Sequence, residues 1–100
     1  RHRFCDHANL TKCLADRFPA YLQAYRSLRH GGVEQADVGR YCVLHRHGGI
    51  YADIDYEPRS SFYSELAGSG LAYLVESPYE ELGERVQNSL LASPPGHPFW

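Results

Sequence analysis

The chain has 100 residues, the size of one domain or of part of one. With 43% hydrophobic and 22% charged residues and no low-complexity tract, its composition is that of a folded protein and excludes a disordered one. The formal net charge is −2 and the lysines and arginines are scattered, which argues against a nucleic-acid-binding surface.

The first predicted elements are two short helices within residues 10–29. Apolar residues recur there at helical spacing, and Pro19 is able to open the second helix at its first turn. A longer helix is predicted over residues 34–47. Gly48 and Gly49 would end it, because glycine readily takes a positive φ just past the last turn of a helix.

A short strand is predicted next, over residues 50–54. Because successive strand residues alternate between faces, Ile50, Ala52 and Ile54 would face the core. The polar residues of this segment would share the opposite face, namely Tyr51, Asp53 and Asp55.

Three further elements are predicted after Pro58. Residues 59–70 suggest a short helix and a loop, and residues 71–75 suggest a second buried strand. Residues 84–92 are predicted to form another helix, closed by the breaker run SPPGHP. The order of helix, glycine pair and strand indicates an α/β fold.

The sequence shows neither a membrane-spanning stretch nor a signal peptide. No apolar run approaches the roughly 20 residues of a membrane span, and the first residues lack the apolar stretch of a signal peptide. Both ends look cut, so we expect an internal piece of a larger domain.

The cysteines do not outline a disulfide framework, and Cys42, among apolar neighbours, is interpreted as a small buried residue. A zinc site near the N-terminus would fit no standard spacing; its residues would be His2, Cys5, His7 and Cys13.

Asp53 and Asp55 are the main candidate functional residues. In an extended chain, side chains at i and i+2 project from one face, with Cα atoms about 7 Å apart. Two such carboxylates would suit Mg²⁺ or Mn²⁺, with water and substrate phosphate at the remaining positions. They also follow the C-terminal end of a predicted strand, where open α/β sheets bind ligands. The alternative is a solvated strand end without chemistry.

Asp37 and Arg40 are neighbours at i and i+3 on the predicted long helix. They are either an ordinary surface ion pair or a sugar-binding pair, in which the carboxylate accepts hydroxyls beside a guanidinium. Taken alone, the spacing favours the ordinary ion pair.

Residues 36–55, ADVGRYCVLHRHGGIYADID, resemble the sugar-binding region of glycosyltransferase family 32. The pattern of that family, which includes α-mannosyltransferases and bacterial polysaccharide enzymes, is roughly A-D-x-x-R-Y-x-x-L-x-x-x-G-G-I-Y-x-D-x-D. The residues in register are Ala36, Asp37, Arg40, Tyr41, Leu44, Gly48, Gly49, Ile50, Tyr51, Asp53 and Asp55. The segments around Phe18-Pro19 and NSLLASPPGHPFW extend the resemblance more weakly.

This resemblance implies a GT-A-type nucleotide-sugar-binding fold, present in residues 1–100 as part of a catalytic domain. It further implies a hexosyltransferase of the mannosyltransferase type that uses Mn²⁺ or Mg²⁺ and retains the anomeric configuration. The donor would be a UDP- or GDP-sugar and the acceptor a glycan or lipid. Family members occur in the Golgi lumen of eukaryotes, tethered to the membrane, and in the bacterial cytoplasm.

The resemblance also implies roles for single residues. Asp55 would ligate the metal directly, and Asp53 would contact the donor and metal-bound water. Four residues would bind the donor: Asp37, Arg40, Tyr51 and Asn88.

Two other functions remain open. Haloacid dehalogenase-type phosphotransferases also carry D-x-D after a buried strand, but they favour a small hydroxyl or β-branched residue where this chain has Glu57. The second is a remnant that binds sugar nucleotides without catalysis, which only the sequence on both sides of this chain would address.

Overall fold

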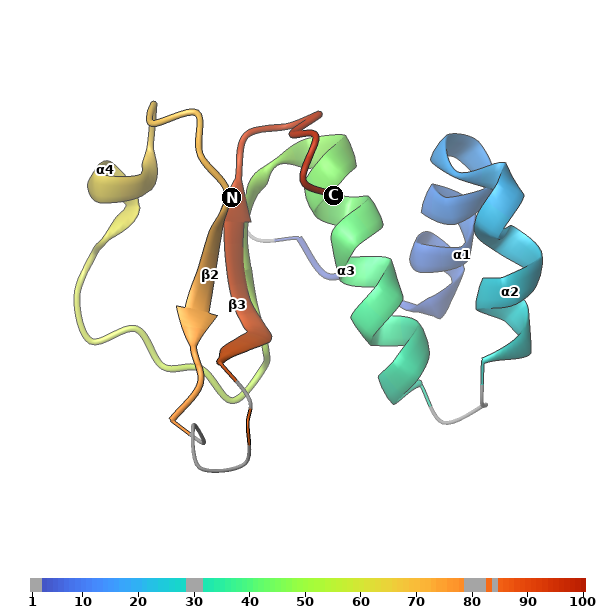
Figure 1. Ribbon diagram of the computed structural model, residues 1–100, viewed down its shortest axis with the longest axis horizontal. Coiled ribbons are helices and arrows are strands. Elements are labelled where there is room, and N and C mark those ends of the chain that lie inside the picture. Colours follow the sequence, from blue (N-terminus) through green and yellow to red (C-terminus); the bar gives the residue numbers. More distant parts are fainter. Residues whose placement is uncertain (1–2, 29–31, 79–82, 84) are drawn as a thin grey trace.

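The computed structural model describes residues 3–28, 32–78, 83 and 85–100. Its N-terminal helices are α1 (His7–Arg17) and α2 (Leu22–Ser27), joined by a 3₁₀ turn, and they pack against the long helix α3 (Val33–His47). The strands of its sheet are β1 (Gly49–Ala52), β2 (Tyr73–Glu76) and β3 (Val86–Ser93). Helix α3 lies between the sheet and the α1–α2 pair (Figure 1). None of the described helices is long and apolar enough to cross a membrane.

The two predicted N-terminal helices are confirmed, and their meeting point is at Pro19. Asp6 caps α1 by accepting a hydrogen bond from the backbone N–H of Asn9 at 2.8 Å. Pro19 then opens the 3₁₀ turn Pro19–Tyr21, which leads into α2.

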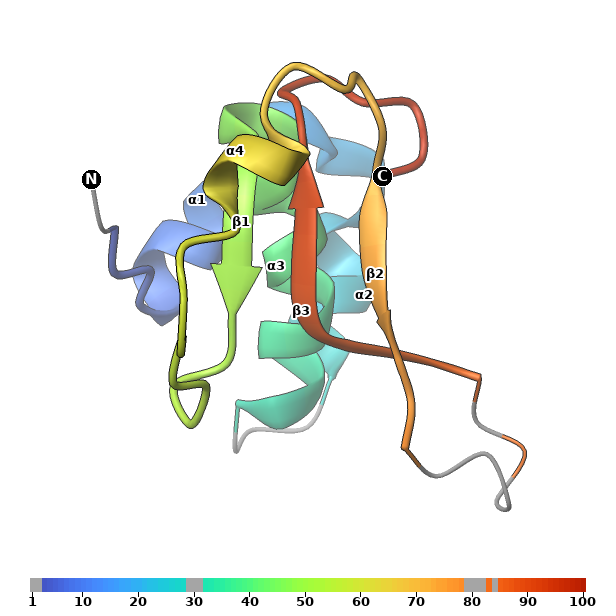
Figure 2. The ribbon, with the colours of Figure 1, turned by 90° about the vertical axis from the view of Figure 1, so that its left-hand side faces the viewer.

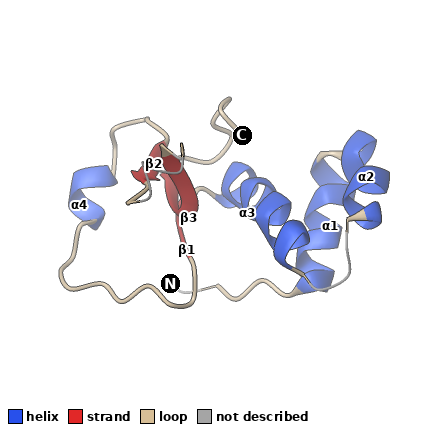
Figure 3. Cartoon of the chain, turned by 60° about the horizontal axis from the view of Figure 1, so that its bottom comes forward, coloured by secondary structure: helices blue, strands red, loops and turns tan. Residues whose placement is uncertain are grey.

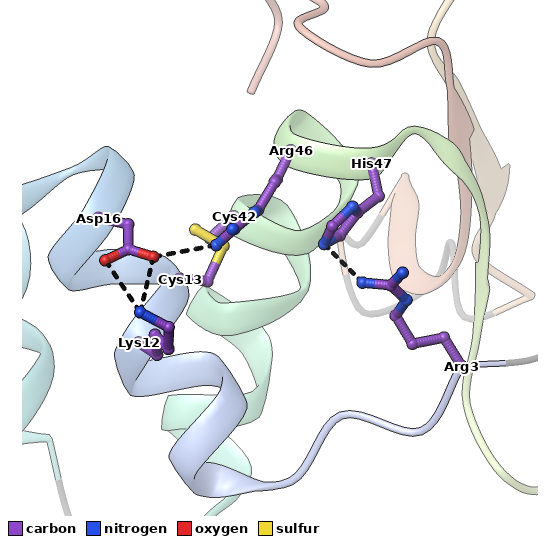
Figure 4. The surroundings of a disulfide bond; sticks show 7 residues. All are labelled: Arg3, Lys12, Cys13, Asp16, Cys42, Arg46 and His47. Atoms are coloured by element: carbon purple, nitrogen blue, oxygen red, sulfur yellow. Dashed lines mark hydrogen bonds and ion pairs between the residues drawn. A yellow bond between two sulfur atoms is a disulfide. The ribbon is translucent and has the colours of Figure 1, made fainter.

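Helices α1 and α3 are joined by a disulfide between Cys13 and Cys42, which corrects the expectation of unpaired cysteines (Figure 4). Both cysteines are buried, as expected for Cys42, and Asp16 of α1 adds an ion pair to Arg46 of α3. Because Cys13 is in this bond, it is not available as a ligand for a zinc site near the N-terminus. The two cysteines are 29 residues apart, so only the packing of the helices brings them together.

The predicted long helix and its glycine stop are also confirmed. Gly48 and Gly49 have φ values of 61° and 95°, which place both in the left-handed region that favours glycine. At Gly48 a side chain is excluded as well, since a Cβ atom would lie 2.5 Å from the backbone nitrogen of Pro95. The chain can therefore turn directly from α3 into β1.

The sheet has the strand order β1-β3-β2, and β3 runs antiparallel to both neighbours (Figure 2). The helix predicted over residues 84–92 is therefore wrong, because most of that segment is the central strand. Its apolar residues Val86, Leu90 and Leu91 do not alternate, and the pairing of β3 with β2 is irregular between Gln87 and Leu91. Period-two alternation, the usual sign of a strand, is lost for this reason.

The faces predicted for the first strand are reversed. Tyr51 contacts the guanidinium of Arg40 in α3, so Tyr51 points toward the helices and Ile50 and Ala52 point away. The strand also ends at Ala52, and Ile54 is 90% exposed. The inner face of this strand is therefore occupied by Tyr51, which covers the buried guanidinium of Arg40, and not by Ile50 or Ile54.

The segment after β1 is mostly loop. It contains the predicted short helix, α4 (Tyr63–Leu66), which lies beyond the sheet on the side away from α3 (Figure 3). Strand β2 overlaps the strand predicted over residues 71–75 but is an edge strand, not a buried one, because it pairs with β3 alone among the described strands. The coarse expectation of a mixed helix and strand fold is confirmed.

Candidate functional site

The irregularity in β3 is a bulge of several residues opposite β2. Leu74 of β2 pairs with Leu91, but the next residue, Val75, pairs with Gln87. One step along β2 thus corresponds to four steps along β3, which leaves residues 88–90 outside the β2 ladder. Bulges of this kind redirect a strand and are common beside active sites.

Two backbone carbonyls of β3 beside the bulge accept hydrogen bonds from other elements. Arg40 of α3 donates from Nη1 to the carbonyl of Asn88 at 2.5 Å. The backbone N–H of Asp53, directly after β1, donates to the carbonyl of Ser89 at 2.8 Å. Residues far apart in sequence are thereby fixed around one point.

Arg40 is the centre of this arrangement and is only 6% exposed. It donates from Nη2 to Asp37 Oδ1 at 2.5 Å, and its Nη1 lies 3.3 Å from Asp53 Oδ1. The ring of Tyr51 covers the guanidinium with its centroid 4.7 Å from Cζ, and Asn88 Nδ2 donates to Asp37 at 3.0 Å. We call these five residues the Arg40 cluster.

The alternative of an ordinary surface ion pair is wrong in its exposure, and the predicted sugar-binding role of Asp37 and Arg40 stays a prediction. Asp37 and Arg40 do pair at i and i+3, but the guanidinium is buried and contacts a second carboxylate. A buried charge is costly unless it is paired and hydrogen-bonded, and Arg40 meets this condition through Asp37, Asp53 and Asn88. The side chains of the two acids are 39% and 34% exposed, so they present carboxylate oxygens to solvent.

Tyr51 is fixed as a hydrogen-bond donor within the cluster. Its hydroxyl donates to Asp53 Oδ1 at 2.7 Å. Burial, and next the hydrogen bond to Asp53, raise the pKa of Tyr51 to about 12. The hydroxyl therefore stays protonated at neutral pH.

Asp55 lies apart from the Arg40 cluster. A turn follows β1, in which the backbone N–H of Tyr56 donates to the carbonyl of Asp53 at 3.1 Å. The two carboxylates are therefore not held by one extended strand, and Asp55 is exposed to solvent.

The metal-binding roles expected of Asp53 and Asp55 stay a prediction, and the one extended strand expected to hold both carboxylates is not what the structure has. Among the described residues, no group of three or more histidines, cysteines or acids is placed to hold a metal. Two carboxylates at one turn nevertheless fit Mg²⁺ or Mn²⁺ bound jointly with a phosphate-bearing substrate, because such ions need only one or two protein carboxylates there.

A polar chain beside the Arg40 cluster was not predicted from the sequence. The hydroxyls of Tyr56 and Ser89 lie 3.1 Å apart, and Ser89 Oγ donates to Gln87 Oε1 at 3.3 Å. These hydrogen bonds were not predicted because residues 84–92 were expected to form a helix, in which the side chains of Gln87 and Ser89 would point in different directions. The polar triplet Gln87-Asn88-Ser89 within an otherwise apolar run was the signal that could have revealed it.

Comparison with known proteins matches most of the chain to one family. Residues 3–72 match the family model described as a glycosyltransferase sugar-binding region containing a DXD motif. The chain is also 28% identical over 101 residues to the uncharacterized glycosyltransferase L373 of Acanthamoeba polyphaga mimivirus. That alignment covers the whole chain but 39% of the relative, so the chain spans about two-fifths of its length. No solved structure matches the chain.

The match covers α3, β1 and the turn with Asp53 and Asp55, whereas Asn88 and the rest of β3 lie beyond it. It favours the glycosyltransferase interpretation over the phosphotransferase one. The chain belongs to the family of glycosyltransferase sugar-binding regions that contain a DXD motif.

Proposed function

We propose that the protein containing this chain is a metal-dependent hexosyltransferase of the GT-A type, similar to family 32 mannosyltransferases. It would move a sugar from a UDP- or GDP-sugar to a glycan or lipid acceptor with retention of configuration. The observation that carries this proposal is the convergence of Asp37, Arg40 and Asp53 from α3 and the end of β1.

The donor sugar would be held by the acids of the Arg40 cluster. Asp37 and Asp53 present partly exposed carboxylates, which are strong acceptors for sugar hydroxyls. Arg40 is itself buried beneath them, so its role in this proposal is to fix both acids in place. Asn88 fixes Asp37 from the side of the sheet.

The metal would be held by Asp55 and Asp53 together with the donor. When bound, it would act as a Lewis acid on the departing diphosphate. Asp55 is exposed and so remains accessible to a metal that arrives with the nucleotide sugar. Asp53 would contribute less freely, since its Oδ1 already contacts Tyr51 and Arg40.

The disulfide favours one of the two expected locations. Disulfides form and persist in oxidising compartments and are rare in the cytoplasm. The pair Cys13–Cys42 therefore supports a lumenal or otherwise oxidising location over the bacterial cytoplasm.

The test uses the full-length protein and a panel of UDP- and GDP-sugars, with and without Mn²⁺. We expect transfer or donor hydrolysis with at least one donor, lost in excess chelator and restored by the metal. Asp55→Asn should remove most of this activity, because a neutral amide is a poor ligand for a hard cation. Glu57→Gln, an exposed acid two residues later, is the matched control and should retain it.

Two outcomes would contradict the proposal. Undiminished transfer in excess chelator would refute the metal requirement. Binding of a nucleotide sugar without turnover under any of these conditions would favour the remnant that binds without catalysis.

A further inference from the structure

A cavity of about 160 Å³ lies between α1 and the last turn of α3, next to the disulfide. One water molecule needs roughly 10–15 Å³ of such space, so the cavity has room for a small polyatomic group in place of several waters. It is smaller than the roughly 300–1,000 Å³ of most small-molecule sites, which suits a single group better than a whole nucleotide sugar. Four of its lining residues are basic, namely Arg3, Lys12, Arg46 and His47.

The basic residues of this cavity come from three segments of the chain. Arg3 precedes α1, Lys12 lies within α1, and Arg46 and His47 lie in the last turn of α3. Figure 4 shows the contact between Arg3 and His47 on one side of the disulfide and the group of Lys12, Asp16 and Arg46 on the other. Because the disulfide ties α1 to α3, it also fixes the separation of the residues that these helices contribute.

Positive charge exceeds negative charge around the cavity. Asp16 forms ion pairs with both Lys12 and Arg46, each at 3.2 Å. Asp6, another acid of this region, is engaged as the N-cap of α1. Among the described residues, no carboxylate forms an ion pair with Arg3. A bound anion would therefore meet positive charge that the described acids do not fully neutralise.

His47 is held neutral by its surroundings. Arg3 donates from Nη1 to His47 Nε2 at 2.9 Å, and a guanidinium group can only donate, so the imidazole is the acceptor. Burial, and next the positive charges of Arg3, Arg46 and Arg17, lower the pKa of His47 below its ordinary value. An anion between these cations would offset the repulsion that they exert on one another.

The cavity is separate from the Arg40 cluster. Arg46 follows Arg40 by six residues on α3, which places it about 9 Å further along the helix axis and on a different face. Arg40 faces the sheet, where it contacts Asn88 and Asp53, whereas the cavity lies on the side of α1. A ligand in the cavity would therefore not occupy the proposed donor site.

We propose that this cavity binds one phosphate group. The two guanidinium groups and the ammonium group of its lining are strong donors to phosphate oxygens, and the guanidinium fork matches the geometry of two such oxygens. The phosphate would be carried either by a soluble phosphorylated compound or by the headgroup of an anionic lipid, and the chemistry of recognition is the same for both. The proposal does not depend on sugar transfer.

The test measures binding to the full-length protein in excess chelator, so that no metal at Asp55 can recruit the probe. Inorganic phosphate is titrated by calorimetry, and the ring resonances of His47 are followed by NMR, with His47→Gln identifying those resonances. We expect saturable binding that shifts the His47 resonances. Arg3→Gln should bind phosphate at least tenfold more weakly, because it loses a hydrogen bond between charged groups.

Arg26→Gln is the matched control. It makes the same change of charge at an exposed position on α2, outside the lining of the cavity. It should bind phosphate as the parent does, because the proposal depends on the position of the charge and not on the net charge of the protein. Melting curves of both variants should match that of the parent, since Arg3 is exposed and precedes α1.

Vesicles distinguish the two sources of the phosphate group. The protein is sedimented with phosphatidylcholine vesicles, with and without phosphatidic acid, whose headgroup is a phosphate monoester. Retention by phosphatidic acid that is lost in Arg3→Gln supports a lipid headgroup, and binding of inorganic phosphate without such retention supports a soluble compound. The inference is overturned if neither probe binds to the parent, or if Arg3→Gln and Arg26→Gln affect binding equally.

Discussion

Arg40 has more partners than a surface ion pair, so replacing it is expected to change both sugar transfer and the free energy of unfolding. Asp37, Asp53 and the carbonyl of Asn88 surround its guanidinium. An exposed pair on a helix contributes only a few tenths of a kcal/mol, whereas a charged group that leaves buried partners unsatisfied costs about 1–3 kcal/mol.

Arg40→Lys is therefore expected to lower both sugar transfer and stability. Lysine keeps the charge but loses the planar fork that reaches two acids and a carbonyl at once. We expect transfer to fall at least tenfold and unfolding free energy to fall by about 1–3 kcal/mol, measured by initial rates and denaturant titration. Asp37→Asn should lose transfer similarly with a smaller loss of stability, because Arg40 retains Asp53. Parent rates in both variants would show that the cluster is only structural.

Tyr51 gives the site a dependence on alkaline pH. Its pKa is raised in the folded state from 10.0 to about 12, mainly by burial. A raised pKa means that its contribution to stability is complete below pH 10 and is lost as the pH rises toward 12. The melting temperature of the parent should therefore fall more steeply over this interval than that of Tyr51→Phe. Parallel curves for the two proteins would show that Tyr51 titrates as a free phenol.

At the scale of elements, the disulfide holds the helix that carries Asp37 and Arg40 against α1. Closing a loop of this length is worth roughly 2–4 kcal/mol by restriction of the unfolded chain. The double variant Cys13→Ala/Cys42→Ala should lose about this much stability in denaturant titration of the full-length protein, and Cys5→Ala, the control, should not. Alkylation of all three cysteines in the folded, unreduced protein would show that the bond does not form.

At the scale of the whole molecule, the chain is nearly as compact as a complete domain but leaves large apolar side chains and strand edges uncovered. Its radius of gyration is 14.1 Å, close to the roughly 13 Å of a compact domain of this length. Yet large apolar residues remain exposed, among them Phe4, Ile54 and Val33, and β1 and β2 each pair with β3 alone among the described strands.

Residues 1–100 in isolation are therefore expected to aggregate or to melt without a sharp transition. Unpaired strand edges and uncovered apolar side chains favour association over a cooperative monomer. Calorimetry of the isolated chain beside the full-length protein makes the comparison, and only the longer protein should show a sharp melt. A soluble monomer with a cooperative transition would show that these residues are an independent domain.

The local features of this protein were set by its sequence alone. Helical spacing, Pro19 and the pair Gly48-Gly49 were sufficient to predict the N-terminal helices, α3 and its stop, because propensity and backbone freedom act within a few residues. The ordered run from Asp37 to Asp55 likewise indicated the family before any geometry was known.

The tertiary structure decided the features that depend on distant residues. The inward face of β1 was set by Arg40, the disulfide by the packing of α1 on α3, and the strand at 86–93 by pairing with both neighbours. The bulge erased the alternation that would have marked that strand, and it left the carbonyl of Asn88 outside the β2 ladder, where that carbonyl accepts a hydrogen bond from Arg40. Strand pairing and the burial of a charge depend on partners contributed by other segments, so no local pattern could have specified them.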